Sequence, residues 1–489
     1  MSLRIFNTQS KKKEEFLPLQ EGKVGIYVCG ITAYDVCHVG HGRSAVVFDV
    51  ITRYLRYRGY EVTFVKNFTD VDDKIIDKAR REQKGIDVIS ERYIREHDED
   101  MEALGVAVPT VTPRATEHID GMVRLVATLI EKGLAYRVDG DIYYAVEKFP
   151  GYGKLSGRCL EDMLAGARID VNDKKHNPYD FSLWKASKDG EPWWESPWGR
   201  GRPGWHLECS VMSQRYLGDT FDIHGGGEDL VFPHNENEIA QSEGASGKPL
   251  ARYWVHNGFV RVNSEKMSKS LGNFFTIRDI LKQYHPEVLR FFMMQSHYRS
   301  PVDFSDAALN EARQGMGRLY STLKTIRDLR TAGVKRTDPS TDSSELDREL
   351  LGQLQRVRER FVEAMDDDFN TARAIGALFD TIRFLNTLLT GKKEGPSAAL
   401  LEQTENALRE VGAVLGLLLE EPDDYLRLDR DREAEKRGLA VSEIEALIAD
   451  RRSAREKKEW QRADEIRNRL AARGVILKDT PTATTWSIA

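Results

Sequence analysis

The feature that most constrains this chain is an apolar run that ends in a glycine turn and is followed by a helical pattern. Val24–Val28 is apolar and ends at Cys29-Gly30, and Ser44–Tyr57 carries apolar residues at helical spacing. The tetrapeptide HVGH at 38–41 therefore falls where a predicted strand leads into a helix N-terminus. Such a terminus presents free N–H groups and a partial positive charge, which suit phosphate. Alone, HVGH is weak evidence, since two histidines at a helix start can simply cap it.

The segments that follow predict further strands, which together would form a parallel sheet. Glu61–Val65 is a short β-rich run that completes a β-α-β unit. The aspartates of NFTDVDDK (67–74) follow at the strand's C-terminal end, where capping of the next helix is favoured over cation binding. Phe221–His224 reads as a strand followed by three glycines, which allow a sharp turn or a close ligand approach. Tyr253–Val262 predicts another strand.

The remaining segments predict an insertion and a helical C-terminal half. Glu147–Gly201 shows weak periodicity and is expected to be inserted between two halves of the sheet. From Asp306 onward the pattern predicts helices, enough for a bundle. Polar linkers are expected at 331–344 and 422–429. Val441–Gly474 is helical and rich in arginine, which suits nucleic acid, although interleaved acidic residues are equally typical of a solvated face.

Composition limits the partners and the compartment. The chain has 489 residues and a net charge of -6, so a polyanion must be held by a local basic face. There is no apolar run of about 18 residues, so no membrane span is expected. Four scattered cysteines do not suggest a disulfide framework, which favours a cytoplasmic protein that uses some of them as thiolates.

A metal site is suggested by two residues one helical turn apart. His234 and Glu238 share one face of a predicted helix, Pro233–Glu243. With Cys29 and Cys209 they offer the mixed nitrogen, oxygen and sulfur donors that zinc accepts. The spacing is not that of a standard zinc finger. From the residues alone, other candidates remain open as ligands: Cys37, Cys159, His206 and His224.

Several distant motifs together resemble a known family. HVGH after a strand, KMSKS after the last strand and a helical C-terminal half resemble the class I aminoacyl-tRNA synthetases. The longer motifs YVCGITAYDVCHVGHGR, NFTDVDDK, GWHLECS, FDIHGGGEDLVFPHNENEIAQS, HNGFV and EKMSKSLGN are similar to those of cysteinyl-tRNA synthetases. The resemblance covers the chain from its N-terminal residues through the bundle and weakens only in the C-terminal region.

This resemblance implies a fold, a reaction and a set of site residues. The expected fold is α/β, a Rossmann-like parallel sheet split by an insertion and followed by an all-α bundle and a small C-terminal domain. The reaction implied joins cysteine to tRNA(Cys) through a cysteinyl adenylate made from ATP. The resemblance implies one zinc ion per subunit on Cys29, Cys209, His234 and Glu238, with Mg²⁺ arriving with ATP. Asn235 stands where the family usually has a second histidine, and what it replaces is an open question.

The resemblance also assigns individual roles. The adenylation residues are His38, His41, Lys266, Lys269 and His224, with His38, Gly40, His41 and Lys269 on ATP. The cysteine pocket is assigned to Gly30, Thr32, Thr69 and Trp205, and Asp229 is assigned to the substrate's amino group. The expected protein is a monomer. Two alternatives remain: a mycothiol-type ATP-dependent cysteine ligase with a non-tRNA acceptor, and a non-catalytic regulator that binds zinc and nucleotide.

The expected domain boundaries follow from the same comparison of motifs. They are 1–112 for the first half of the catalytic domain, 113–203 for the insertion, 204–265 for its second half with the zinc ligands, 266–325 for the KMSKS loop and stem-contact region, 326–425 for the helical bundle, and 426–489 for an anticodon-recognition domain.

Overall fold

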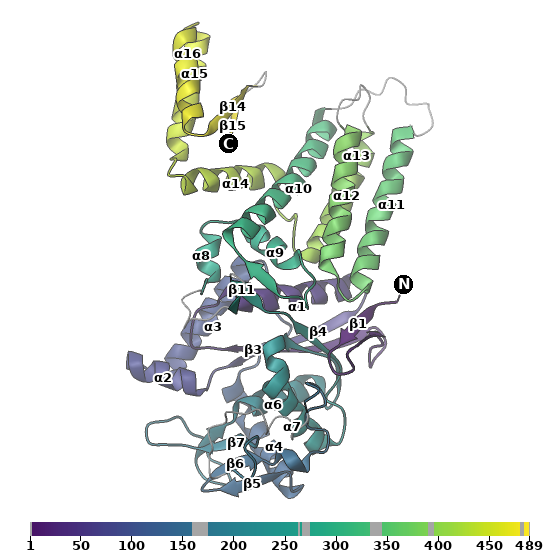
Figure 1. Cartoon of the computed structure of the whole chain (residues 1–489), viewed down its shortest axis with the longest axis vertical. Helices are drawn as coiled ribbons and strands as arrows, with labels where there is room; N and C mark the ends of the chain where they lie inside the picture. The colour runs from purple at the N-terminus through teal and green to yellow at the C-terminus, as the bar shows by residue number, and fades with distance from the viewer. Residues whose placement is uncertain are drawn as a thin grey trace.

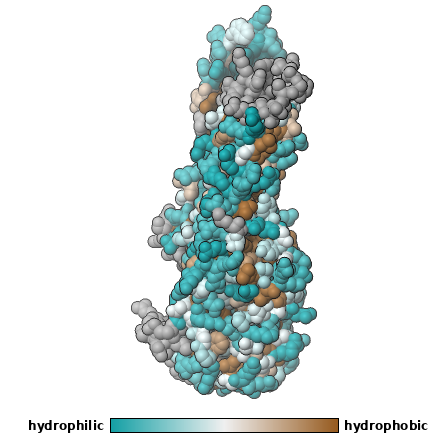
Figure 2. All heavy atoms as spheres, turned by 90° about the vertical axis from the view of Figure 1, so that its right-hand side faces the viewer, coloured by the Kyte–Doolittle hydropathy of each residue, from teal (hydrophilic) through white to brown (hydrophobic). Residues whose placement is uncertain are grey.

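The molecule is elongated, with α/β layers toward one end and helices toward the other (Figure 1). The computed structural model describes residues 2–158, 175–262, 265–266, 274–332, 345–389, 396–479 and 484–488. Among these residues, no helix is long and apolar enough to cross a membrane. The face of the molecule that Figure 2 shows is mostly hydrophilic, with small separate hydrophobic patches.

A four-stranded parallel sheet organises the first half of the chain. Its strands lie in the order β10-β9-β3-β4, with β3 at Lys23–Thr32, β4 at Glu61–Thr69, β9 at Phe221–Gly227 and β10 at Ala251–Asn257. Because neighbouring side chains point to opposite faces of a strand, Ile26 and Val28 enter one core while Tyr27 and Cys29 enter another. Both faces of the sheet are therefore covered, as parallel sheets require.

Helices from different parts of the chain cover the two faces. One face packs against α1 (Val39–Tyr57) and α3 (Ile86–Ala103). The other face packs against α4 (Ile119–Glu131), α6 (Trp205–Leu217) and α7 (Glu236–Ser246). Shorter elements complete this part: β1 (Arg4–Asn7), β2 (Lys12–Glu15), α2 (Asp73–Glu82), η1 (Ala115–His118), η2 (Val146–Lys148), η3 (Glu228–Leu230) and η4 (Val231–Asn235). Asp72 caps α2 by accepting a hydrogen bond from the Lys74 amide, as expected for this acidic stretch.

The three glycines at the end of β9 differ from the expectation. The strand runs through Gly227, and none of the three glycines has a positive φ, so there is no sharp turn there. Gly225 instead allows close packing, since a Cβ at this position would lie 2.3 Å from the ring of Phe48 in α1. The glycine is thus required for the helix to lie against the sheet.

The insertion contains more regular structure than its sequence predicts. Four antiparallel strands form a sheet in the order β5-β6-β7-β8, at Ala135–Val138, Asp141–Tyr144, Phe181–Ala186 and Gly201–Pro203. The sequence at Gly140–Val146 reads as a strand, and β6 lies within that stretch, whereas the other three strands carry no such signal. Its core includes the fully buried Trp184. The four strands are only three to six residues long, which leaves little periodicity to detect.

A helical half follows the sheet, as expected. A small sheet of β11 (Val260–Val262), β12 (Glu265–Lys266) and β13 (Val302–Phe304) leads into it. The helices are α8 (Ile277–Leu281), α9 (Pro286–Met294), α10 (Asp306–Ala332), α11 (Glu345–Asp366), α12 (Thr371–Leu389) and α13 (Ala398–Leu415). A buried ion pair of 2.6 Å between Arg290 of α9 and Asp49 of α1 joins this half to the parallel sheet and its helices. The expected linker at 331–344 lies almost wholly outside the described residues.

The second expected linker is wrong. Residues 422–429 belong to the helix α14 (Pro422–Lys436), with the proline in its first turn. The polar composition suggested a linker, but the buried Tyr425 stacks on Tyr320 of α10 at 3.8 Å. This contact anchors a helix in which most residues are charged.

A small unit closes the chain beyond α14 (Figure 1). It consists of α15 (Val441–Glu456), α16 (Trp460–Ala472) and a hairpin of β14 (Val475–Asp479) and β15 (Thr484–Ile488). Trp486 lies in its core, and its indole donates a 2.6 Å hydrogen bond to Glu445. Together with the sheet and the bundle, this unit confirms the expected fold class.

Candidate active site

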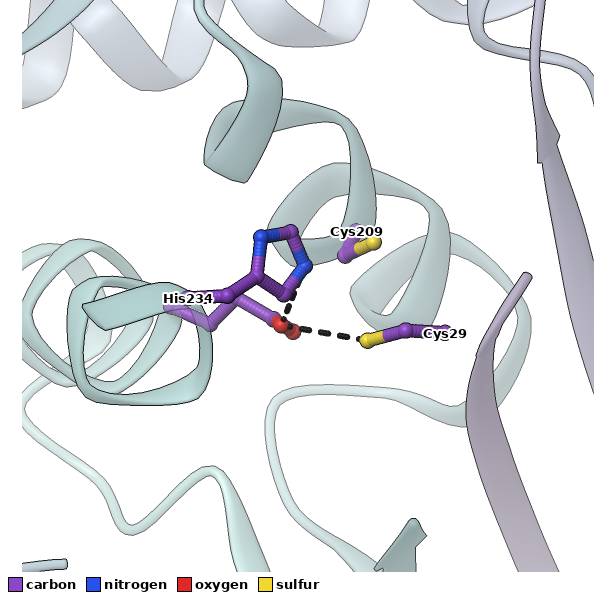
Figure 3. A group of neighbouring side chains, drawn as sticks. Cys29, Cys209 and His234 are labelled. Atoms are coloured by element: carbon purple, nitrogen blue, oxygen red, sulfur yellow. Dashed lines mark hydrogen bonds and ion pairs between the residues drawn. The ribbon is translucent and has the colours of Figure 1, made fainter. Parts of the chain in front are cut away.

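Four potential metal ligands meet at the carboxyl end of the sheet. Cys29 comes from β3, Cys209 from α6, His234 from η4 and Glu238 from α7. All four are buried, and one donor atom from each lies within 4.8 Å of the others. Figure 3 shows the labelled Cys29, Cys209 and His234 pointing toward one another. The fold therefore brings together the set that the resemblance implied.

The donor geometry fits a bound metal ion. Cys29 Sγ lies 3.2 Å and His234 Nε2 lies 3.1 Å from Glu238 Oε1. Although buried, His234 Nε2 has no hydrogen bond of acceptable geometry. Tetrahedral zinc accepts thiolate, imidazole and carboxylate at about 2.0–2.3 Å, so its ligand atoms lie a little over 3 Å apart. An imidazole nitrogen without a hydrogen bond, facing a carboxylate and two sulfurs, is the arrangement such an ion needs.

The surroundings favour the metal-binding forms of two of the four ligands, Cys209 and Glu238. Hydrogen bonding with Cys29 lowers the pKa of Cys209 to about 6, so this thiol becomes a thiolate readily. Burial raises the pKa of Cys29 well above its ordinary value. Burial also opposes ionisation of Glu238, but His224 and His234 together hold the pKa of this carboxyl well below its usual range. A cation placed here would meet a carboxylate and at least one thiolate.

Asn235 answers the question that the sequence left open. Its amide nitrogen donates to Glu238 Oε1 at 2.9 Å and lies 3.6 Å from Cys29 Sγ. Its carbonyl oxygen lies 3.0 Å from His256 Nε2, and His256 Nδ1 lies 2.9 Å from Thr8 Oγ1. Asn235 therefore orients Glu238 and Cys29, and it is itself held in place by His256 of β10. Sequence reasoning missed His256 and Thr8; the signal for His256 was its place at the start of the motif HNGFV.

Two further histidines lie against the ligands. His224 Nε2 lies 2.8 Å from Glu238 Oε2, and its ring stacks on Trp254 at 4.3 Å. His206 Nδ1 lies 2.8 Å from His234 Nδ1. Both candidates thus contact a ligand without joining the group of four. Cys37 is buried but does not belong to this group, and Cys159 lies outside the described residues.

The residues assigned to the cysteine pocket lie around the same carboxyl end of the sheet. The Gly30 amide donates to Asn67 Oδ1 at 2.9 Å, and a Cβ on Gly30 would lie 1.5 Å from the Asn67 carbonyl oxygen, so only glycine fits. Thr32 pairs with Thr69 in the register of β3 and β4, and Thr69 Oγ1 donates to Glu208 at 2.6 Å. Trp205 is 41% exposed, with its ring 4.3 Å from that of His234.

HVGH forms the N-terminus of α1, as expected. His38 is the N-cap residue, and its Nδ1 accepts a hydrogen bond of 3.0 Å from the Gly40 amide. His41 Nδ1 accepts from the His38 amide at 3.3 Å, and the two rings stack at 3.7 Å. Since each Nδ1 is an acceptor, a neutral ring carries its proton on Nε2. Both Nε2–H groups are thereby left as donors for a ligand.

Both imidazoles are neutral near pH 7. Burial lowers the pKa of His38 to about 4, although the negative charge of Asp229 opposes this shift. Burial lowers the pKa of His41 well below its ordinary value, and positive charge on His38, Lys66 and His97 would lower it further. The influence of Asp229 also places this carboxylate near HVGH. Lys266 ends β12, whereas Lys269 and the rest of KMSKS lie outside the described residues.

Comparison with known proteins identifies the family. The tRNA synthetases class I (C) catalytic domain matches residues 15–314, a DALR domain matches 360–420 and the cysteinyl-tRNA ligase anticodon binding domain matches 438–486. Solved structures share the fold: Mycobacterium tuberculosis methionyl-tRNA synthetase with methionyl-adenylate has a TM-score of 0.57 at 16% identity, covering 86% of this chain and 94% of that one. A putative arginyl-tRNA synthetase from Campylobacter jejuni has a TM-score of 0.54 at 13% identity, covering 83% and 95%. The fold and the site thus define a class I aminoacyl-tRNA synthetase.

Full-length relatives narrow this class. The cysteine–tRNA ligase of Geobacter metallireducens is 57% identical over 489 residues, covering all of both chains. That of Geobacter sulfurreducens is 55% identical, also over the whole of both chains. The chain belongs to the cysteine–tRNA ligase family and is an aminoacyl-tRNA ligase.

Proposed function

We propose that this enzyme activates L-cysteine with ATP to cysteinyl adenylate and transfers the cysteinyl group to the 3′ end of tRNA(Cys). The proposal rests mainly on one observation. Cys29, Cys209, His234 and Glu238 converge at the carboxyl end of the sheet, where HVGH also begins α1. The full-length match to cysteine–tRNA ligases supports the same reaction. Here the carboxylate of cysteine attacks the α-phosphate of ATP, and pyrophosphate leaves.

Selection of cysteine is assigned to the metal group. Zinc bound by the four ligands supplies a Lewis acid that takes a thiolate readily and a serine hydroxyl poorly. The chain's own part is to hold the donors rigidly: Asn235 and His224 fix the carboxylate of Glu238 through hydrogen bonds of 2.8–2.9 Å. A purely apolar pocket would separate such similar side chains by only about 10–200-fold. Gly30, Thr32, Thr69 and Trp205 shape the cysteine pocket, and Asp229 binds the amino group.

Adenylation is assigned to neutral donors at the start of α1. The Nε2–H groups of His38 and His41 donate hydrogen bonds to phosphate oxygens as negative charge moves toward pyrophosphate, and the helix N-terminus adds its partial positive charge. Gly40 lets the nucleotide approach the backbone. Lys266 and Lys269 act on the same oxygens from the KMSKS loop. His224 serves adenylation through Glu238, and Mg²⁺ enters with ATP rather than on a protein site of its own.

Binding of the acceptor, tRNA(Cys), is assigned mainly to the C-terminal half of the chain. Residues 1–112 and 204–265 form the catalytic domain around the insertion 113–203, while 266–325 contact the acceptor stem. The bundle at 326–425 and the unit at 426–489 bind the tRNA body and its anticodon. The enzyme acts as a monomer in the cytoplasm, a compartment that keeps the free thiols of Cys29, Cys37 and Cys209 reduced.

The decisive experiment is ATP–pyrophosphate exchange with each standard amino acid on protein assayed for zinc, before tRNA is added. We expect exchange with cysteine alone at about one zinc per chain. Exchange with serine comparable to cysteine would overturn selection by the thiolate. Absence of exchange in folded, zinc-loaded protein would overturn the enzymatic proposal and favour a regulator.

A second measurement tests the acceptor. With tRNA(Cys) added, we expect cysteinyl-tRNA to form, whereas a mycothiol-type ligase would activate cysteine and leave the tRNA uncharged. A matched pair of variants tests the site: Cys209→Ser should lose both zinc and exchange, whereas Cys37→Ser, at a buried cysteine outside the group of four, should retain both.

A further inference from the structure

A cavity of about 520 Å³ lies on the opposite face of the sheet from the metal group. It is enclosed by β4, α1, α3 and the segment 105–109 that follows α3. Most of its wall is apolar and comes from all of these elements: Ala45, Phe48, Phe64, Phe68, Met101 and Val106. Protein sites for small ligands have about this size, roughly 300–1,000 Å³, and are mostly apolar with a few polar groups.

Two nitrogen-bearing side chains in this apolar wall have no partner for their functional atoms. The Lys66 ammonium makes no hydrogen bond or ion pair among the described residues, and burial lowers its pKa. His97 is 6% exposed; its Nδ1 lies 3.0 Å from Asp98 Oδ1, but its buried Nε2 has no hydrogen-bond partner. An unpaired cation beside an apolar wall costs free energy that a bound anion would offset, whereas Nε2 of the neutral His97 ring is an acceptor, because its Nδ1–H faces the Asp98 carboxylate.

The other charges around the cavity are compensated or face solvent. Arg53 bonds to Asp49 at 2.9 Å and to the Gly105 carbonyl. The side chain of Asp98 is 63% exposed, and Glu102 is exposed at the rim. Lys66 is therefore the one cation without an ion pair among the lining residues, all of which the structure describes, although the Asp98 carboxylate is close enough to raise its pKa.

We propose that this cavity is a second binding site, for a small molecule that joins an apolar group to a carboxylate. The carboxylate pairs with the Lys66 ammonium, while the apolar group lies against Phe48, Phe64 and Met101. A phosphate dianion fits less well, because one ammonium leaves most of its oxygens unsatisfied in an apolar wall.

The site is close to the adenylation machinery without belonging to it. Ser44, Ala45 and Phe48 belong to α1, the helix that begins at HVGH. Lys66 and His97 are also close enough to influence the pKa of His41. A ligand in this cavity would thus lie beneath the helix that holds the proposed ATP-binding histidines.

The test uses the full-length protein and 4-phenylbutanoate, with the neutral 4-phenylbutanamide as matched probe, measured by calorimetry. For a probe of about twelve heavy atoms we expect a Kd on the order of 0.1–1 mM. The carboxylate should bind about tenfold more tightly than the amide, because only the carboxylate forms a charge-assisted hydrogen bond with Lys66. Equal affinity for the two probes, or no binding of the carboxylate, would overturn the proposal.

Three variants locate the binding. Lys66→Met should lower carboxylate affinity about tenfold and leave amide affinity unchanged, since it removes the charge and keeps the chain length. Ala107→Phe, on the half-buried lining segment, should abolish binding of both probes by filling the cavity. Lys248→Met, at a lysine outside the cavity, should change neither. An unchanged carboxylate affinity in Lys66→Met would refute the assigned contact.

A readout on the unmodified chain keeps the test independent of variant folding. The methyl group of Met101 lines the cavity. In protein labelled at methionine methyls, 4-phenylbutanoate should shift the Met101 resonance and leave that of Met212, on the other face of the sheet, in place. Shifts that spare Met101 would place the probe elsewhere and overturn the proposal.

Discussion

His38 illustrates how much chemistry one backbone contact determines. Its Nδ1 accepts from the Gly40 amide, so the neutral ring must carry its proton on Nε2. Burial disfavours the imidazolium and lowers the pKa of His38 from 6.5 to about 4. The neutral donor is thus the form present at physiological pH. Because the unfolded chain binds this proton first, the ring favours folding above pH 6.5 and loses this effect as the pH falls toward 4.

We predict that His38 stays neutral from pH 8 down to about 5. The measurement is an NMR titration of protein with ¹³C-labelled histidine rings, with His38→Gln used to assign the resonance. His38 should titrate with a pKa of about 4 and show the Nε2–H tautomer above it. A midpoint near 6.5 would contradict the geometry at the start of α1.

A single substitution at Asn235 tests whether the residues that hydrogen-bond to the metal ligands affect zinc binding. Asn235→Ala removes the hydrogen bond to Glu238 and leaves His256 without its partner. We predict a 10–100-fold loss in zinc affinity, the usual cost of removing a group that orients a metal ligand. Competition with a chromogenic chelator measures it. The matched control is Asn237→Ala in the adjoining helix α7, where the side-chain carbonyl accepts a hydrogen bond from Tyr152 and contacts no ligand. Equal zinc affinity in the two variants would contradict the orienting role.

At the scale of elements, α1 and β9 approach closely because Gly225 has no side chain. Gly225→Ala would place a Cβ 2.3 Å from the Phe48 ring, and neither the sheet nor the helix can move freely. We predict a loss of about 1–3 kcal/mol in the free energy of unfolding, as for other overpacked cores. Chemical denaturation followed by circular dichroism measures it. Gly376→Ala in α12 is the control, because nothing lies within 4 Å of the added Cβ; it should be neutral or stabilise by up to about 1 kcal/mol. If Gly225→Ala left the free energy of unfolding unchanged, α1 would be able to move away from the sheet.

The elements also show what sequence patterns can predict. The apolar run at 24–28 and the apolar pattern at 44–57 predicted the right kind of element and lie inside β3 and α1, and the helical half from 306 onward was also predicted. Three of the four insertion strands and α14 were not, because short strands show little pattern and α14 depends on a distant contact between Tyr425 and Tyr320. The same limit applies at the site. The four ligands lie in recognisable motifs, whereas the contacts of His256 with Asn235 and Thr8 join positions 21 and 248 residues apart.

At the scale of the whole molecule, a chain of net charge -6 is proposed to bind a polyanion. Much of the positive charge in the C-terminal unit is already paired: Arg451 bonds to Asp479 and Arg462 to Asp450. Arg452 and Arg467 are exposed and form no ion pair within the part of the chain that the structure describes. These two guanidinium groups are therefore available to phosphates at lower cost than the paired ones.

We predict that Arg452→Gln combined with Arg467→Gln weakens binding of tRNA(Cys) about three- to tenfold and reduces the slope of log K against log salt by about 1–2. Filter binding across a range of salt concentrations measures both quantities. Cysteine-dependent pyrophosphate exchange should not change, because the sheet edge and HVGH are remote in the chain from this unit. Arg462→Gln, at an arginine already bonded to Asp450, should have a smaller effect on the salt slope. If this control reduced the slope as much as the double variant, pairing within the unit would not decide which charges face the tRNA. If exchange fell together with affinity, the C-terminal unit would act on the catalytic domain itself and not only on the acceptor.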